Sequence, residues 1–139
     1  MIVVDASVAY ALLDDCDAGH AAARSWYDRP HRELLTTPLV LAEVDHLAES
    51  RLGSAARSAF LDDISGGGYY VSWWNSAANE CARIARRYLD LGVSLTDASL
   101  VALAARLGTT SIATFDERHF RAMQPLTGEP AFTLLPADA

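Results

Sequence analysis

Short β-branched runs alternate with longer helical segments along this chain, and this alternation constrains the fold more than any other feature. Ile2–Val4 and Ser111–Thr114 are strand-length runs whose brevity and β-branched residues favour buried strands. The segments between such runs carry apolar residues at helical spacing and end at glycine or before proline. Strands that alternate with helices predict an α/β fold with a parallel sheet that is covered on both faces. In such sheets, ligands bind beyond the carboxyl ends of the strands.

The expected elements follow from apolar spacing, capping residues and turn residues. Strands are predicted at Ile2–Val4, Leu34–Thr37, Tyr69–Ser72, Ser111–Thr114 and Phe132–Leu135. Helices are predicted at Ala6–Leu13, Ala18–Asp28, Pro38–Leu52, Ser54–Ile64, Ala78–Tyr88 and Asp97–Leu107. Ser54 and Thr96 are the expected N-caps of their helices, because their hydroxyl groups can accept a backbone N–H bond. Pro38 suits a first helical turn, and Gly53, Gly92 and Gly108 are expected helix ends.

A length of 139 residues fits one domain that spans residues 1–139. Ser65–Gly68 is long enough for a loop and too short for a domain linker. Cys16 and Cys81 lie outside zinc-ligand and C-x-x-C spacing, so we expect two small buried apolar residues. The first apolar stretch, Met1–Val4, carries no basic n-region, so we do not expect a signal peptide. No run approaches the ~20 apolar residues of a membrane span. The expected location is therefore the cytoplasm.

The net charge is −7, and all 11 basic residues are arginines. An acidic protein gains no general attraction to nucleic acid, so any RNA contacts must come from local arginines and bound cations. The absence of lysine excludes mechanisms that require this residue. It therefore argues against a phospho-acceptor signalling domain and against a phosphohydrolase of the haloacid-dehalogenase kind.

Four carboxylates occupy unusual positions, namely Asp5, Glu43, Asp97 and Asp116. Asp5 and Asp116 follow predicted strands and therefore belong to the rim where a site is expected. Asp97 begins a very apolar helix, where the helix dipole favours the ionised form. Glu43 lies among apolar neighbours, where a charge is costly without a partner. Converging carboxylates raise one another's pKa, and Mg²⁺ or Mn²⁺, which prefer oxygen ligands, would offset their repulsion.

Taken singly, each of these acids has a simpler interpretation. Asp5 and Asp97 could only stabilise helix N-termini. Asp116 could be a turn residue, and Glu43 could face solvent.

At these acids the sequence resembles PIN domains. Four motifs of this family are matched in order. Ile2–Ser7 resembles the opening strand and D-x-S motif, and Pro38–Val44 resembles the glutamate helix. Ser94–Leu100 resembles the third acidic motif, and Ala113–Phe120 resembles the closing strand with its acid. Each motif is weak alone, but the ordered set spans nearly the whole chain. The length and single-domain organisation resemble those of VapC-type toxins.

The resemblance implies a three-layer α/β/α sandwich around a mainly parallel sheet. It implies that Asp5, Glu43, Asp97 and Asp116 form a Mg²⁺ or Mn²⁺ cluster, supported by hydroxyl groups of Ser7, Thr96 and Thr114. The implied reaction is hydrolysis of RNA that leaves a 5′-phosphate. The implied partners are a VapB-type antitoxin, which plugs the active site and binds operator DNA, and a second copy of the chain. Candidate RNA contacts are Arg51, Arg57, Arg86, Arg87 and Arg118.

The sequence suggests three alternatives to a metal-dependent toxin. Glu43 and His46 form one Glu-x-x-His pair, whereas a di-iron bundle needs two pairs and two further glutamates. A metal-independent ribonuclease could use a histidine pair, but no orienting partner is recognisable for His20, His31, His46 or His119. A solitary RNA-processing PIN nuclease stays open.

Two further groups of residues have competing interpretations. Asp14, Asp15 and Asp17 could hold Ca²⁺, but their spacing is not that of an EF-hand, which favours solvated loop charge. One side chain of the Trp73–Trp74 pair is expected to be exposed, at a dimer or antitoxin contact.

Overall fold

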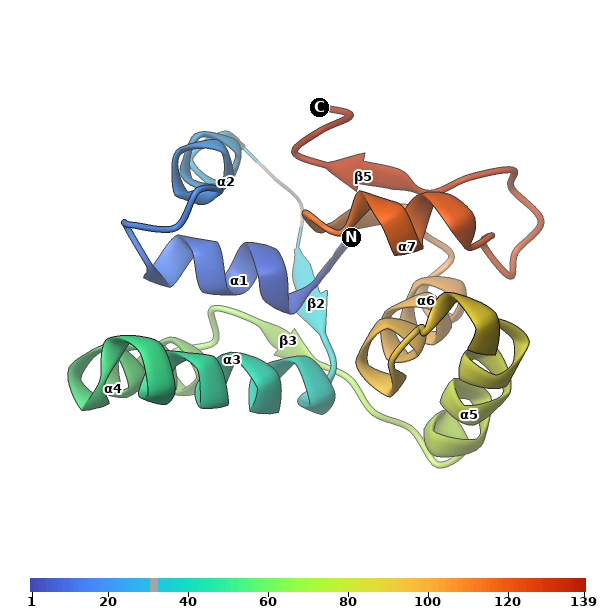
Figure 1. Ribbon diagram of the computed structural model, residues 1–139, viewed down its shortest axis with the longest axis horizontal. Helices are drawn as coiled ribbons and strands as arrows, with labels where there is room; N and C mark the ends of the chain where they lie inside the picture. Colours follow the sequence, from blue (N-terminus) through green and yellow to red (C-terminus); the bar gives the residue numbers. More distant parts are fainter. Residues whose placement is uncertain (31–32) are drawn as a thin grey trace.

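The computed structural model describes residues 1–30 and 33–139 and places a parallel sheet at its centre (Figure 1). The five strands have the order β3-β2-β1-β4-β5, and every neighbouring pair is parallel. Their bounds are β1 (Ile2–Val4), β2 (Leu34–Thr36), β3 (Tyr70–Val71), β4 (Ser111–Ala113) and β5 (Thr133–Leu135). The predicted strands are thus confirmed, each within one or two residues of its expected ends.

Helices flank this sheet, which confirms the predicted α/β/α sandwich. Their bounds are α1 (Ala6–Leu13), α2 (His20–Tyr27), α3 (Pro38–Leu52), α4 (Ser54–Ser65), α5 (Ala77–Arg87), α6 (Leu95–Leu107) and α7 (Glu117–Ala122), with a 3₁₀ turn η1 (Leu89–Leu91). In Figure 1, α1 to α4 lie to the left and α5 to α7 to the right. None of the helices formed by the described residues is long and apolar enough to cross a membrane.

Strand β1 lies in the middle of the sheet, between β2 and β4. Val3 pairs with Ile112 and Val4 pairs with Ala113, and all four side chains are buried. Because the chain continues past both strand ends at the same edge, the Asp5 amide donates a hydrogen bond to the Ala113 carbonyl (2.9 Å). The strand order reverses between β1 and β4, which is where α/β sheets bind ligands.

Helix α6 packs against both β1 and β4. Its residues from Ala98 to Ala104 are all buried, as expected of a helix that is apolar on every side. It ends at Gly108, whose left-handed backbone (φ +66°) suits glycine and lets its N–H bond to Ala104. The start of α6 therefore faces the carboxyl edge of the two central strands.

Both predicted N-caps are wrong. The α6 cap is Ser94, whose extended backbone lets its Oγ accept a hydrogen bond from the Asp97 amide, while Thr96 lies inside the first turn. Ser54 is the first residue of α4, and its hydroxyl donates to Glu49 instead.

Other helices also differ from expectation in their boundaries, and one helix was not predicted. Helix α2 begins at His20 because the Asp17 carboxylate accepts the Gly19 amide (2.7 Å), which holds the preceding residues in a turn. Gly92 ends the 3₁₀ turn η1, whereas α5 already ends at Arg87. Helix α7 was not predicted, because six residues are too few to show a helical period.

Candidate active site

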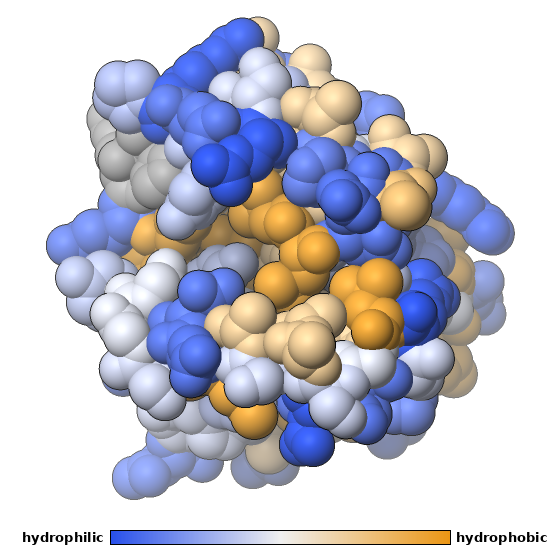
Figure 2. Space-filling view, turned by 90° about the vertical axis from the view of Figure 1, so that its left-hand side faces the viewer, coloured by the Kyte–Doolittle hydropathy of each residue, from blue (hydrophilic) through white to orange (hydrophobic). Residues whose placement is uncertain are grey.

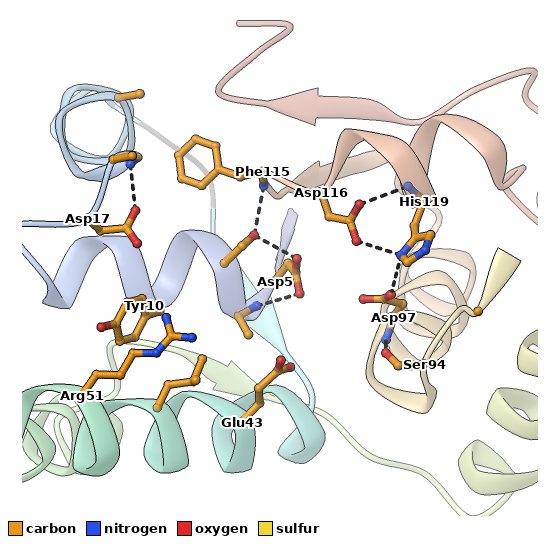
Figure 3. Close-up of a pocket in the computed structure, with 17 residues that line it drawn as sticks. Asp5, Tyr10, Asp17, Glu43, Arg51, Ser94, Asp97, Phe115, Asp116 and His119 are labelled. Carbon is orange, nitrogen blue, oxygen red and sulfur yellow. Dashed lines mark hydrogen bonds and ion pairs between the residues drawn. The ribbon is translucent and has the colours of Figure 1, made fainter.

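The predicted acids converge on one pocket of about 760 Å³ at the carboxyl edge of the sheet (Figure 3). Asp5 follows β1 and Asp116 lies beyond the end of β4, while Glu43 comes from α3 and Asp97 from α6. Residues from four parts of the chain thus contribute oxygen atoms to one cavity.

Asp5 is the most deeply buried of these acids, at 5% exposure. Its Oδ1 accepts the Ala6 amide (2.7 Å), and its Oδ2 accepts the hydroxyl groups of Thr114 (2.7 Å) and Ser7 (3.0 Å). Burial raises the pKa of Asp5, and these hydrogen bonds oppose that shift. Asp5 therefore caps α1, as its simpler interpretation holds, and lines the pocket as well.

Two of the three predicted supporting hydroxyl groups tie Asp5 to the segment after β4. Thr114 Oγ1 accepts the Asp116 amide (2.9 Å), and Ser7 Oγ accepts the Phe115 amide (3.0 Å). Thr96, like Thr114, is outside the set of described residues that line the pocket, and its backbone carbonyl accepts a hydrogen bond from the Ser99 hydroxyl (2.6 Å). The hydroxyl groups of Ser7 and Thr114 thus set the position of Asp116 relative to Asp5.

Asp97 lies in the first turn of α6, and its side chain is 14% exposed. Its pKa is raised to about 6, first by burial and then by the charges of Asp5 and Asp116; His119 acts in the opposite direction. These couplings show that the acids face one another across the pocket.

Glu43 lies on the exposed side of α3, and that side borders the pocket. The position of Glu43 agrees with the simpler interpretation of a solvent-facing residue, and its site role stays a prediction. Burial raises the pKa of Glu43, and the charge of Asp5 raises it further. The start of α3 is held against α6 by a hydrogen bond between the buried hydroxyl groups of Thr37 and Ser99 (2.8 Å).

His119 lies between two of the acids, although the sequence indicated no orienting partner for it. Its Nδ1 is 2.9 Å from Asp116 Oδ2 and 3.3 Å from Asp97 Oδ2, and its Nε2 is 3.0 Å from the Leu91 carbonyl oxygen. Asp116 Oδ1 also caps α7 by accepting the His119 amide. The D-x-x-H spacing at the start of a short helix is the signal that could have revealed the pair.

Two of the other histidines, His20 and His46, are described by the structure and lie outside this arrangement. His20 bonds to the Ala11 carbonyl oxygen through Nδ1 (2.7 Å), so it too has a partner. His46 is exposed on α3. His31 lies outside the described residues.

Arg51 is the one predicted RNA-contacting arginine that lines the pocket. Its guanidinium lies 5.3 Å from the centre of the Tyr10 ring, and the Tyr10 hydroxyl donates to Asp14 (2.6 Å). By contrast, Arg57 is paired with Asp45 (2.6 Å). Arg51 therefore places a positive charge at the end of the pocket away from Asp97 and Asp116, as Figure 3 shows.

The donor set fits a hard divalent cation. The pocket gathers carboxylates whose pKa values are raised by burial and by one another, which is the cost of bringing them together without a counter-ion. Carboxylate oxygens are the ligands that Mg²⁺ and Mn²⁺ prefer. Asp97, Asp116 and His119 offer ligand atoms that all lie within 4.8 Å of one another.

Comparison with known proteins agrees with this geometry. The family model described as "PIN domain" matches residues 2–124. The chain belongs to the PIN domain family. It is 35% identical over 136 residues to "Ribonuclease VapC26" of Mycobacterium tuberculosis (strain ATCC 25618 / H37Rv), a match that covers 97% of this chain and all of that protein. It is therefore a PIN domain of the VapC type.

Solved structures share the fold of this PIN domain. The crystal structure of Mycobacterium tuberculosis VapC20, described as a sarcin-ricin loop cleaving toxin, superimposes with a TM-score of 0.79 and 23% identity. That match covers 84% of this chain and 91% of the other. FitAcB from Neisseria gonorrhoeae gives a TM-score of 0.60 and 17% identity, and covers 84% and 88% of the two chains.

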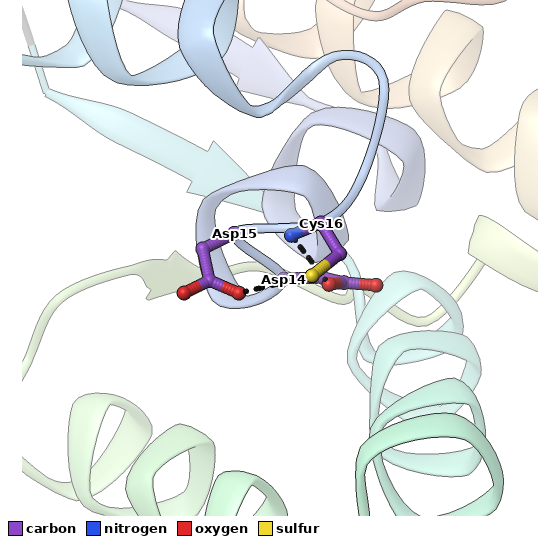
Figure 4. Close-up of side chains that lie close together, drawn as sticks. All are labelled: Asp14, Asp15 and Cys16. Carbon is purple, nitrogen blue, oxygen red and sulfur yellow. Dashed lines mark hydrogen bonds between the residues drawn. The ribbon is translucent and has the colours of Figure 1, made fainter.

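In the acidic loop that follows α1 of this PIN domain, the polar groups form hydrogen bonds with one another within local turns. Asp14 accepts the Cys16 amide (3.0 Å), and the Cys16 thiol contacts Asp15 (Figure 4). The interpretation of this loop as solvated charge agrees with these exposed contacts. Cys16 is exposed, so its predicted burial is wrong, because polar turn residues surround it; Cys81 is buried as expected.

Two apolar features lie outside the acid cluster of the PIN domain. Figure 2 shows hydrophobic residues gathered in a hollowed part of the face that carries the ends of α1, α2 and α4. A cavity of about 200 Å³ between these elements has a mixed lining, in which Leu12, Leu13 and Phe60 lie beside the charged residues Arg24 and Asp63. Trp73 is exposed and Trp74 partly buried, as predicted for the pair.

Proposed function

We propose that this chain is a Mg²⁺- or Mn²⁺-dependent endoribonuclease and the toxin of a type II toxin–antitoxin module. One observation carries the proposal: Asp5, Glu43, Asp97 and Asp116, which come from distant parts of the chain, line a single pocket at the switch point of the sheet. The name of the VapC26 relative supports the same activity.

Asp5, Glu43, Asp97 and Asp116 would hold the cation. When bound, the ion supplies a Lewis acid that activates water and neutralises charge on the phosphodiester. Ser7 and Thr114 orient Asp5 through their hydroxyl groups.

Two lining residues, Arg51 and the cation-holding Glu43, also have roles toward the RNA and the attacking water. Glu43, at the exposed side of the pocket, is placed to accept a proton from water on its carboxylate. Arg51 is placed to bind a phosphate of the RNA next to the cleaved bond.

The proposed partner is a VapB-type antitoxin, through which the chain associates with operator DNA. We also propose that two copies of the chain form a homodimer. The pocket continues from the acids along Tyr10, Ala22 and Leu47 of α1, α2 and α3. This extension gives a partially apolar wall on which an antitoxin segment would block access to the acids.

The test is RNA cleavage by Asp97→Asn and Asp5→Asn variants, with Asp62→Asn as the matched control. Each of the first two changes removes one ligand charge and keeps the side-chain shape, whereas Asp62 is exposed on α4. We expect cleavage to fall on the order of 100-fold or more in both, because several kcal/mol of transition-state stabilisation are lost. The control should match the wild type.

Cleavage-site mapping on total RNA with and without EDTA completes this test. Growth arrest on expression should disappear in the same two variants. Full cleavage by either variant, or by the wild type in excess EDTA, would contradict the proposed mechanism.

A further inference from the structure

His119 lies among the acids, within the closing motif Ala113–Phe120, but the resemblance to PIN domains assigned a role only to the acid of that motif. It comes from the short helix α7, and its ring faces Asp97 on α6 and Asp116 at the end of the β4 segment (Figure 3). The inference rests on the proposed metal dependence and concerns which side chains bind the divalent ion.

The ring tautomer follows from the Leu91 contact. The Leu91 carbonyl oxygen is 3.0 Å from Nε2, and a carbonyl oxygen can only accept, so Nε2 carries a proton. The nitrogen that faces the acids is therefore Nδ1. Metal-binding histidines typically donate their other ring N–H to a backbone carbonyl or carboxylate in this way, which fixes the tautomer and aims the lone pair.

The surroundings of Nδ1 require a positive centre. Two carboxylate oxygens, of Asp116 and Asp97, lie 2.9 Å and 3.3 Å from it. Ionised carboxylates only accept hydrogen bonds, so a lone pair on Nδ1 would be repelled by both. Either a second ring proton or a cation shared by the three atoms removes this repulsion.

The 2.9 Å distance from Nδ1 to Asp116 Oδ2 is that of an N–H···O hydrogen bond, and the same spacing also suits two ligands of a shared cation. Neighbouring ligands of an octahedral ion with metal–ligand bonds of about 2.1 Å are separated by roughly 3 Å. The two nitrogen–oxygen distances lie close to this value. The Asp116 Oδ2 atom is directed to this position because Oδ1 is engaged by the His119 amide.

We infer that His119 Nδ1 binds the divalent ion directly, together with Asp97 Oδ2 and Asp116 Oδ2, and that this nitrogen ligand makes the site prefer Mn²⁺ to Mg²⁺. An imidazole ligand suits transition metals, whereas Mg²⁺ favours oxygen donors and retains water. His119 therefore distinguishes this site from a cluster of carboxylates alone.

Pulsed electron paramagnetic resonance on the Mn²⁺-loaded chain tests the ligand directly. We expect ¹⁴N modulation of the Mn²⁺ spin echo in the wild type, and its replacement by the ¹⁵N pattern when histidine is ¹⁵N-labelled. Because the labelling needs no substitution, this readout does not depend on how a variant folds. The His119→Gln variant should lose the modulation, and His46→Gln, on the exposed side of α3, should keep it.

The outcomes separate this inference from the proposed function. Bound Mn²⁺ without nitrogen modulation would overturn the His119 ligand and leave the carboxylate site intact. Absence of any bound Mn²⁺ would overturn the metal dependence itself.

Titration calorimetry with MnCl₂ and MgCl₂ measures the preference. In His119→Gln we expect the Mn²⁺ affinity to fall about 10-fold or more, while the Mg²⁺ affinity changes by less than about 3-fold. An equal loss for the two ions would mean that His119 only holds the acids in place, and would overturn the inference.

Discussion

At the residue scale, the acids of the pocket are held in two different ways. Asp5 is buried but receives hydrogen bonds from Ala6, Ser7 and Thr114. Asp97 has its amide capped by Ser94, while its carboxylate faces other acids and His119. At Asp5 the hydrogen bonds therefore offset part of the effect of burial on the pKa, whereas at Asp97 burial and the neighbouring acids raise the pKa and His119 opposes them.

Removing the Asp97 charge is expected to stabilise the metal-free protein at neutral pH. Its folded pKa of about 6 lies above the ordinary value of 3.8 for an aspartate, so between these values the native state binds more protons than the unfolded chain. Stability then falls as pH rises through this window. After discounting for solvent screening, Asp97→Asn should gain on the order of 1–2 kcal/mol at neutral pH.

Urea unfolding in EDTA as a function of pH measures this effect, with Asp62→Asn as the control. The gain of Asp97→Asn should shrink as pH falls through the window and vanish below the unfolded pKa, where both proteins carry a neutral side chain. A variant less stable than the wild type at neutral pH would show that His119 outweighs burial and the neighbouring acids.

At the element scale, α6 shows where local patterns mislead. Ser94 and Thr96 are both good N-cap residues, and both precede the apolar run. Only the backbone course decides between them: Ser94 is extended (ψ 164°), which brings its Oγ to the Asp97 amide. The shift of two residues places Asp97 within the first turn rather than at its edge.

Alanine substitutions at these two positions test this assignment. Ser94→Ala should cost about 1 kcal/mol of unfolding free energy because it removes the cap hydrogen bond. Thr96→Ala should change the stability by less than about 0.5 kcal/mol. Chemical denaturation of the metal-free variants gives both values, and a larger loss at Thr96 would restore the prediction made from the sequence.

At the scale of the whole molecule, the pocket exists only in the folded chain. Its acids are contributed by the ends of β1 and β4 and by α3 and α6, which meet because β1 lies beside β4. The chain carries a net charge of −7, so a cation at this concentrated negative site also relieves repulsion over the whole molecule.

A divalent ion is therefore expected to raise the melting temperature. Because it binds the native state and not the unfolded chain, Mn²⁺ at about 100 times its dissociation constant should add about 2.7 kcal/mol. Thermal unfolding with and without MnCl₂ measures this gain. Asp5→Asn should reduce it and Asp62→Asn should not. An unchanged wild-type melting temperature in saturating Mn²⁺ would contradict a native cation site.

Much of the fold and site follows from the sequence because their signals are local. The β-branched runs, the helical spacing and the helix-ending residues Gly53 and Gly108 predict the order of elements and the parallel sheet. Asp5 and Asp116 are recognisable because each follows a strand. Glu43 and Asp97 are recognisable because each interrupts an apolar pattern. Such signals need only the neighbours along the chain.

The tertiary structure alone decided which side chains meet. His119 contacts Asp97 and Leu91, and Thr114 contacts Asp5, across separations of up to 109 residues. These contacts depend on strand order and on the rotation of each helix about its axis, which are set by packing of the whole core. Local periodicity determines the direction of the backbone, but the packing determines which lone pairs and charges share a pocket.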